Sequence, residues 1–329
     1  MRSLSRKNIL FYLIRFSVIF VVAYFMVAPI FLSFQSLLPE HNRVALDLYQ
    51  PFRGLSFLNI LGQFLRGVVF AFIFYPFYSL IFERRGGKLL LFTSMFGLGL
   101  FGSVEPQPGS IEGIVYTITS FTEHASILIA VAIQMLIFVL IMFKFETYLY
   151  GDNRCFEVVD LFLPNRHLIK AFIIRFTIVH LFTYWIVGGI FYQISGYQEV
   201  LESMEIFILW RPLDNLTTVF LVFFGQIFRG IFLAILLYPF SQNFIEKKRG
   251  WALLYLLMTG LTILGSPLFL AEFISFKGST LEFFQSLAVG IPEIFSQMLV
   301  FSLLFFFWQK RKETKQLQTL KYNMSVFLT

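Results

Sequence analysis

The chain has 329 residues, of which 57% are hydrophobic and only 14% are charged. A soluble domain is nearer about one quarter charged, so this composition excludes an ordinary soluble protein. The single cysteine, Cys155, excludes an intrachain disulfide.

Eight apolar runs account for the composition. They cover roughly residues 9–32, 57–82, 89–103, 123–143, 168–193, 217–241, 251–271 and 292–308, and the third is the shortest. A bilayer core of about 30 Å needs about 20 such residues per helix. Continuous runs of this kind predict helices and not barrel strands, because lipid offers no hydrogen-bond partner to an open backbone. The sequence therefore predicts an all-α polytopic membrane protein with about eight transmembrane helices.

Basic residues alternate along the loops between these runs. With the N-terminus inside, cytoplasmic segments hold 18 of the 26 Lys and Arg residues and outer loops hold four. Such a bias is typical of cytoplasmic loops in membrane proteins. It predicts an integral protein of the cytoplasmic (inner) membrane, with both termini cytoplasmic. The net charge of +7 then follows from membrane topology, and nucleic acid is not expected as a partner.

One long segment of the second predicted span occurs twice. Residues 62–87 recur at 225–250, with a constant offset of 163. Matched positions include Gln63 with Gln226, Arg66 with Arg229, Gly67 with Gly230, Ala71 with Ala234 and Pro76 with Pro239. Small residues four apart favour close packing of helices in lipid, and each proline predicts a kink near the preceding tyrosine.

Weaker matches extend the repeat over most of the chain. Arg15-Phe16 in the first span matches Arg175-Phe176 in the fifth at an offset of 160. Gly102-Ser103 matches Gly265-Ser266, and Ile111-Glu112, which follows a predicted helix start at Ser110, matches Leu281-Glu282. In the fourth and eighth spans two registers compete. An offset of 170 pairs Glu123 with Glu293, whereas an offset of 163 pairs Gln134 with Gln297.

These matches divide the chain into two halves. Residues 1–150 form the first four-helix repeat, 151–167 a cytoplasmic linker, 168–308 the second four-helix repeat and 309–329 a basic cytoplasmic tail. Because each half has an even number of spans, the two repeats are parallel. Parallel repeats are related by a pseudo-two-fold axis along the membrane normal.

Two arginines lie deep within apolar runs. Arg66 is 17 residues from Glu83, and Arg229 is equally far from Glu246. At a rise of 1.5 Å per residue, both are about 25 Å from the inner boundary, in the outer third of the bilayer. Glu293 lies at about 24 Å and Glu123 at about 32 Å by the same rise. The candidate substrate-binding set is Arg66, Arg229, Gln63, Gln226, Glu123 and Glu293.

A buried arginine in lipid must pair with an acid, reach water or bind an anionic ligand. One alternative is therefore structural, with Arg66 and Arg229 paired to Glu123 and Glu293, and another is snorkelling to the outer headgroups. The functional alternative is an outward-open polar cavity that holds an anionic or headgroup-like substrate. His180, inside the fifth span, either bonds a neighbouring helix or relays protons.

Three function classes remain. The first is a transporter or flippase-like permease with a polar site between the repeats. The second is a membrane-embedded enzyme that acts on a lipid-linked substrate and uses Glu123, His124 and Arg66. The third is a non-catalytic scaffold or partner subunit. No catalytic motif or P-loop occurs in the sequence, which disfavours the enzyme, and no cofactor or metal is expected. Membrane lipids are the expected surroundings.

Overall fold

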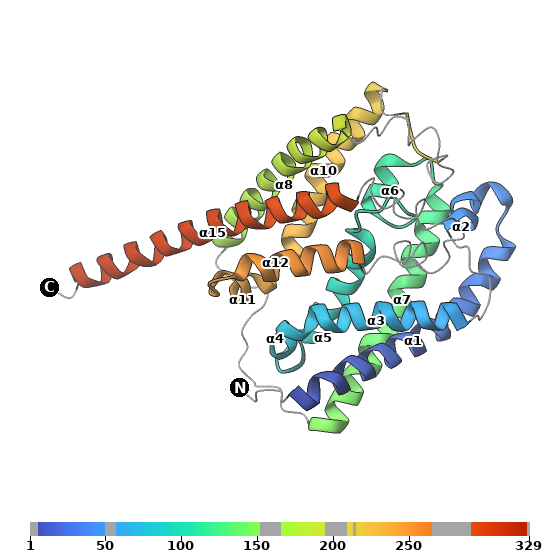
Figure 1. Ribbon diagram of the computed structural model, residues 1–329, viewed down its shortest axis with the longest axis horizontal. Coiled ribbons are helices and arrows are strands. Elements are labelled where there is room, and N and C mark those ends of the chain that lie inside the picture. Colours follow the sequence, from blue (N-terminus) through green and yellow to red (C-terminus); the bar gives the residue numbers. More distant parts are fainter. Residues whose placement is uncertain are drawn as a thin grey trace.

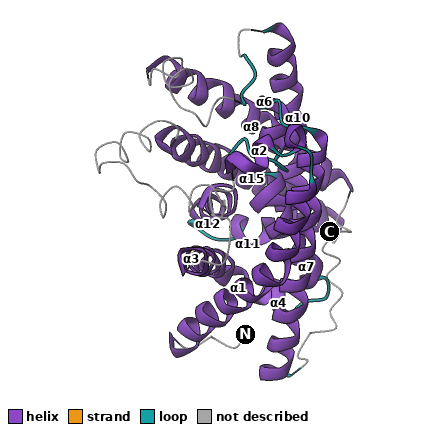
Figure 2. Cartoon of the chain, turned by 90° about the vertical axis from the view of Figure 1, so that its right-hand side faces the viewer, coloured by secondary structure: helices purple, strands orange, loops and turns teal. Residues whose placement is uncertain are grey.

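The protein is a bundle of helices. The computed structural model describes residues 6–49, 57–151, 166–194, 209–212, 215–264 and 291–327. These residues contain helices and no strand, apart from one isolated bridge between Thr117 and Trp210 (Figure 2). Six helical segments are long and apolar enough to cross a membrane: Ile9–Leu37, Asn59–Phe82, Phe121–Tyr150, Leu168–Ile194, Leu216–Ile245 and Ile291–Lys312. The fold class is thus that of a helical membrane protein.

The third and seventh predicted spans correspond to shorter apolar helices, Gly87–Phe101 and Gly250–Ile263. The first combines 7 residues of α5 with 8 of the π-helix η3. A helix of that size is about 22 Å long, which is less than the bilayer core of about 30 Å. Six of the eight predicted spans therefore have the length to cross a membrane.

Figure 1 shows how the helices follow one another. The first half comprises α1 Arg6–Leu37, η1 Glu40–Asn42, α2 Val44–Tyr49, α3 Phe57–Phe74, η2 Tyr75–Phe77, α4 Tyr78–Phe82, α5 Gly87–Thr93, η3 Ser94–Phe101, α6 Ile111–Tyr116 and α7 Phe121–Tyr150. The second half comprises α8 Arg166–Ile194, α10 Leu216–Leu237, η5 Tyr238–Phe240, α11 Ser241–Ile245, α12 Gly250–Thr259, η6 Gly260–Leu264 and α15 Ile291–Phe327. The long α15 projects well beyond the other helices in Figure 1.

The predicted kinks at Pro76 and Pro239 are confirmed. Each proline lies in a short 3-10 turn, η2 or η5, that interrupts the long helix. A proline removes one backbone donor and crowds the carbonyl four residues earlier, so the regular helix ends there. The long helices α3 and α10 are thus followed by the short helices α4 and α11.

The small residues of the repeated segment allow close helix packing, as predicted. A Cβ atom on Gly67 would lie 2.6 Å from the Cα of Ser17, so α1 passes directly against α3. On α10, a Cβ atom on Gly230 would lie 3.3 Å from the Cα of Thr177 on α8. Close approach increases van der Waals contact where lipid provides no hydrophobic driving force.

The two halves contact each other at pairs of residues that are related by the sequence offset of 163. A Cβ atom on Gly97 of η3 would lie 2.4 Å from Leu236 Cδ1 of α10. A Cβ atom on Gly260 of η6 would lie 2.4 Å from Ile73 Cδ1 of α3. Both the two glycines and the two aliphatic residues are 163 positions apart. Each short π-helix therefore packs against the long helix of the other half in the same way.

Ring contacts distinguish the two registers of the fourth and eighth spans. Phe138 of α7 packs on Phe16, with ring centroids 4.7 Å apart, and Phe301 of α15 packs on Phe176 at 4.6 Å. Phe138 and Phe301 are related by the offset of 163, and Phe16 and Phe176 by that of 160. The packed parts of α7 and α15 thus follow the register of Gln134 and Gln297, not the one that pairs Glu123 with Glu293.

Candidate functional site

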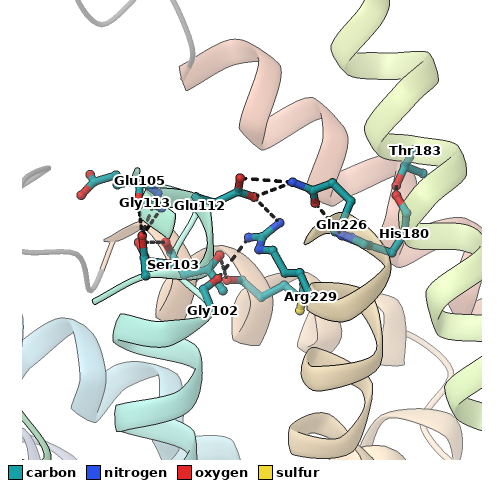
Figure 3. Close-up of polar contacts among 12 residues, drawn as sticks. Gly102, Ser103, Glu105, Glu112, Gly113, His180, Thr183, Gln226 and Arg229 are labelled. Atoms are coloured by element: carbon teal, nitrogen blue, oxygen red, sulfur yellow. Dashed lines mark hydrogen bonds and ion pairs between the residues drawn. The ribbon is translucent and has the colours of Figure 1, made fainter. Parts of the chain in front are cut away.

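A buried ion pair joins the two halves (Figure 3). Arg229 Nη1 of α10 lies 3.1 Å from Glu112 Oε1 of α6, and the exposed fractions of the side chains are 1% and 4%. The acid comes from the first half of the chain and the arginine from the second. Removing either partner would leave a buried charge without compensation, which costs about 3–5 kcal/mol.

Two further polar side chains extend this pair. Gln226 Nε2 lies 3.1 Å from both carboxylate oxygens of Glu112, and Gln226 Oε1 lies 3.1 Å from His180 Nε2 of α8. Because the amide nitrogen donates to the carboxylate, the amide oxygen accepts, and His180 Nε2 must carry the hydrogen. Gln226 and His180 are both buried. We call Glu112, Arg229, Gln226 and His180 the inter-half network.

Arg229 also holds the end of a broken helix. Its Nη2 donates to the carbonyl oxygen of Gly102 at 3.1 Å, directly after η3. Irregular backbone at membrane depth is tolerated only where protein or a cavity satisfies it. Gly102 lies 15 residues after Gly87 and so about 22 Å along the helix, which matches the depth of about 25 Å for Arg229. The network is thus at the point where the short helix of the first half stops.

The segment before α6 fixes the position of Glu112. Ser110 is the N-cap of α6, as predicted, and its hydroxyl accepts from the backbone nitrogen of Gly113 at 2.8 Å. A Cβ atom on Gly113 would lie 2.1 Å from the carbonyl oxygen of Gln107, so no larger residue fits there. The first turn of α6 is therefore packed against the preceding loop, and Glu112 has a defined direction toward α10.

A short segment of the second half is paired with the C-terminal end of α6. The backbone nitrogen of Ile118 donates to Leu209 at 2.9 Å, and that of Arg211 donates to Tyr116 at 2.7 Å. The rings of Tyr116 and Trp210 are 5.3 Å apart. Together with the low exposure of the ion pair, this pairing describes a closed site. The expected outward-open cavity is not the arrangement found at Arg229.

Burial raises the pKa of the Glu112 carboxyl, while the Arg229 guanidinium and the Gln226 amide act in the opposite direction. The physical cause is desolvation, because a low-dielectric surrounding disfavours the charged form. Whether the Glu112 carboxyl is ionised therefore depends on its contacts with Arg229 and Gln226.

The equivalent arginine of the first half has different surroundings. The Arg66 guanidinium lies over the rings of Phe20 and Phe70, at 5.6 and 5.4 Å from their centroids. Phe20 corresponds to His180 at the offset of 160. Gln63, the counterpart of Gln226, has a buried side-chain oxygen that finds no hydrogen-bond donor within the described residues. The imidazole of the inter-half network thus has a phenylalanine as its counterpart.

Glu123 stabilises a helix start. It forms a capping box with Ser120 at the beginning of α7. Its Oε1 accepts from the backbone nitrogens of Ala45 and Leu46 at 2.7 and 3.3 Å, and its Oε2 accepts from Ser120. These contacts attach α2 to α7. The neighbouring His124 accepts from the backbone nitrogen of Gly109 at 2.9 Å through Nδ1.

The structural alternative that paired Arg229 with Glu123 or Glu293 is therefore wrong for this arginine, because Arg229 forms its ion pair with Glu112. Glu293 lies instead beside α8, where a Cβ atom on Gly188 would be 3.2 Å from its Oε1. Of the six residues predicted for the site, the network brings together Arg229 and Gln226.

A second buried cluster lies at the other end of the first half. Arg15 of α1 pairs with Glu146 of α7 and donates to the Tyr150 hydroxyl at 2.9 Å. Tyr78 donates to Glu146 at 2.7 Å. This cluster joins α1, α4 and α7 within one half, so it differs from the inter-half network in connecting only neighbouring helices.

Comparisons with protein-family models, with curated proteins and with solved structures give no match to this chain. The functional argument therefore depends on the geometry of the site.

Sequence reasoning did not select Glu112 for the site, although a signal was present. Glu112 follows the Ser110 helix start and belongs to the matched pair Ile111-Glu112 and Leu281-Glu282, of which Glu282 lies outside the described residues. Glu112 was placed in an outer loop because the third run was counted as a full span. The short helix instead ends beside Arg229, and the next segment brings Glu112 into contact with α10.

Proposed function

We propose that this chain is a permease that moves an anionic or headgroup-like substrate across a cytoplasmic (inner) membrane. The substrate site lies between two parallel four-helix repeats, in the outer half of the bilayer, and both termini are cytoplasmic. Arg229 is the anion ligand and Gln226 supports it. Arg66 and Gln63 are the corresponding positions of the other repeat. The substrate chemistry that fits one arginine and one amide is a monoanionic oxyanion, such as a phosphodiester or a carboxylate.

The observation that carries this proposal is the buried ion pair between Arg229 and Glu112, which connects the two halves. Charged residues inside membrane segments cost about 2.5–3.5 kcal/mol each on insertion scales and mark ion or substrate pathways. A pair placed between halves would break and re-form when the halves rock against each other, whereas a pair within one half would not.

The broken helices support the same function. In transporters, short or glycine-interrupted apolar segments at corresponding positions of two halves mark the substrate site near the bilayer midplane. Here α5–η3 and α12–η6 are short, contain π-helix at matched positions and pack on the opposite half. Arg229 holds the end of η3 through the Gly102 carbonyl.

The other function classes receive less support. The enzyme alternative needs Glu123 and His124 directed at a substrate, but their described contacts stabilise a helix start and the Gly109 turn. The scaffold alternative requires the inter-half network to be structural only. It then predicts that a folded variant without the ion pair retains every function of the protein.

Reconstituted transport tests the proposal. The purified full chain is placed in liposomes with two probes, labelled dimethyl phosphate as a soluble phosphodiester and fluorescent phosphatidylglycerol as a lipid one. Wild type is expected to move one of them, and Arg229→Gln to lose at least tenfold in rate while remaining monodisperse. Arg43→Gln is the matched control, because Arg43 forms its ion pairs with Glu40 and Asp47 in the outer helices. Equal rates in Arg229→Gln and wild type would exclude this site.

A further inference from the structure

The charges of the inter-half network balance one another. Arg229 carries one positive charge, Glu112 in its ionised form carries one negative charge, and Gln226 is neutral. The guanidinium already donates to Glu112 and to Gly102, each at 3.1 Å. An anion that binds both Nη groups of Arg229 displaces Glu112 from Nη1, and Nε, which has no hydrogen-bond partner among the described residues, is a further donor to it.

Displacement alone leaves the site with a net negative charge. A buried charge without compensation costs several kcal/mol, and the cost rises where water is excluded. If Glu112 binds a proton, the same site holds Arg229, the anion and a neutral carboxylic acid, and it is neutral again. Neutral occupancy thus requires one proton for each monoanion.

We propose that Glu112 is the proton-binding group of this permease, and that each monoanion enters together with one proton on the Glu112 carboxyl. The proposal rests on the proposed transport function and adds its coupling ion. The proton comes from the aqueous side that supplies the anion, attaches to a carboxylate oxygen of Glu112 and leaves on the opposite side with the anion. No net charge crosses the membrane.

Gln226 and His180 allow both protonation states of Glu112 to be hydrogen-bonded. In the ionised state the Gln226 amide nitrogen donates to Glu112 and the amide oxygen accepts from His180. After protonation, a rotated amide accepts from the Glu112 hydroxyl and donates to His180, which then takes its other tautomer. Glutamine offers one donor side and one acceptor side, and neutral histidine can be either, so the hydrogen bonds from Glu112 to Gln226 and from Gln226 to His180 are kept in both states.

The remaining charged and titratable neighbours are consistent with a single proton site. Besides Arg229 and His180, Tyr184 of α8 packs against the apolar cluster of α6. Glu105, in the loop before α6, interacts electrostatically with Arg66. Burial raises the pKa of Glu112, which brings its proton binding closer to neutral pH. In the first half, Phe20 occupies the position that corresponds to His180. The hydrogen-bonded pair of glutamine and histidine is therefore not repeated there.

The test measures protons and charge in the transport assay. Liposomes contain a pH-sensitive dye, and a potassium gradient with valinomycin sets the membrane potential. Dimethyl phosphate remains a monoanion across the pH range, so any pH dependence belongs to the protein. With the probe that wild type transports, we expect the liposome lumen to acidify as the probe enters. The transport rate should not depend on the membrane potential. The rate should fall by about tenfold per pH unit above the pKa of the carboxyl.

Glu112→Gln imitates the protonated acid. We expect the anion flux that remains in this variant to occur without acidification or pH dependence, and to respond to the membrane potential. Glu112→Asp keeps a carboxyl and should keep the proton. Wild-type flux that follows the potential without acidification would overturn the proton coupling while leaving the permease intact, and this measurement does not require the variant to fold. No flux of either probe would instead overturn the proposed function itself.

Discussion

Phe77 and Phe240 are equivalent positions of the two repeated segments, and their rings are in edge-to-face contact with centroids 5.0 Å apart. Equivalent residues of the two repeated segments are thus in direct contact. Both rings are fully buried. The 3-10 turns η2 and η5, which contain the prolines that interrupt the long helices, therefore meet in the interior of the protein.

This relationship predicts a cross-link between the halves. In a Cys155→Ser background, Phe77→Cys with Phe240→Cys should join the two halves on oxidation or with a short bifunctional thiol reagent. A protease site inserted in the linker at 151–167 allows the joined fragments to be seen on a denaturing gel. The control pair is Phe72→Cys with Ile235→Cys. These positions are also equivalent, but they are 60% and 49% exposed and so face outward. Joining of the control pair alone would contradict the packing.

A double-mutant cycle tests the energetics of the ion pair. Glu112→Gln or Arg229→Gln alone should each lower the free energy of unfolding by about 3–5 kcal/mol, because each leaves a buried charge. The double variant should cost less than the sum of the two, since neither charge remains. Unfolding of the purified protein in mixed detergent micelles, followed by circular dichroism, measures all three. Additive losses would show that the two side chains do not interact.

The close contact between α1 and α3 predicts the effect of adding one methyl group. Gly67→Ala should lower the free energy of unfolding by about 1–3 kcal/mol, because the new Cβ meets the backbone Cα of Ser17, which cannot rotate away. Gly189→Ala in α8 is the control. A Cβ atom there meets nothing within 4 Å, and alanine favours a helix by about 1 kcal/mol over glycine. Thermal unfolding in detergent ranks the two variants, and equal midpoints would argue against the helix contact.

Glu123 is expected to affect stability and not transport. Glu123→Ala removes the capping box of α7, which costs about 0.5–2 kcal/mol, and leaves the backbone nitrogen of Ala45 without its acceptor. The variant should therefore unfold at lower temperature but move the transported probe at the wild-type rate per folded molecule. A rate as low as that of Arg229→Gln, at unchanged stability, would return Glu123 to the substrate site.

The sequence predicted the elements that depend on local patterns. Apolar runs located the six long helices, the prolines located η2 and η5, and Ser110 located the start of α6. The partner of Arg229 was not predictable in the same way. Local sequence shows that an arginine in lipid needs a partner, but which acid reaches it depends on where a short helix stops. The run at 89–103 is apolar enough for a span, and only its length of about 22 Å as a helix places Glu112 at the depth of Arg229.

The closed state of the site predicts how a thiol placed in it reacts. Ser103 is fully buried next to Gly102, whose carbonyl accepts from Arg229. In a Cys155→Ser background, Ser103→Cys changes one atom and should be protected from a membrane-impermeant thiol reagent in intact cells. His41→Cys, in the exposed turn η1, should be labelled and shows that the reagent reaches the outer face.

Trp210→Ala removes the ring that packs on Tyr116 at the end of α6. Because this segment is paired with the end of α6, the helix that carries Glu112, its loss should raise the labelling rate at Ser103→Cys several-fold without changing that at His41→Cys. Fast labelling at Ser103→Cys with Trp210 present would mean that the site is open outward at rest, and the occluded ion pair would then be a minor state. Protection in both backgrounds would place the barrier elsewhere and remove the 209–211 segment from the access path.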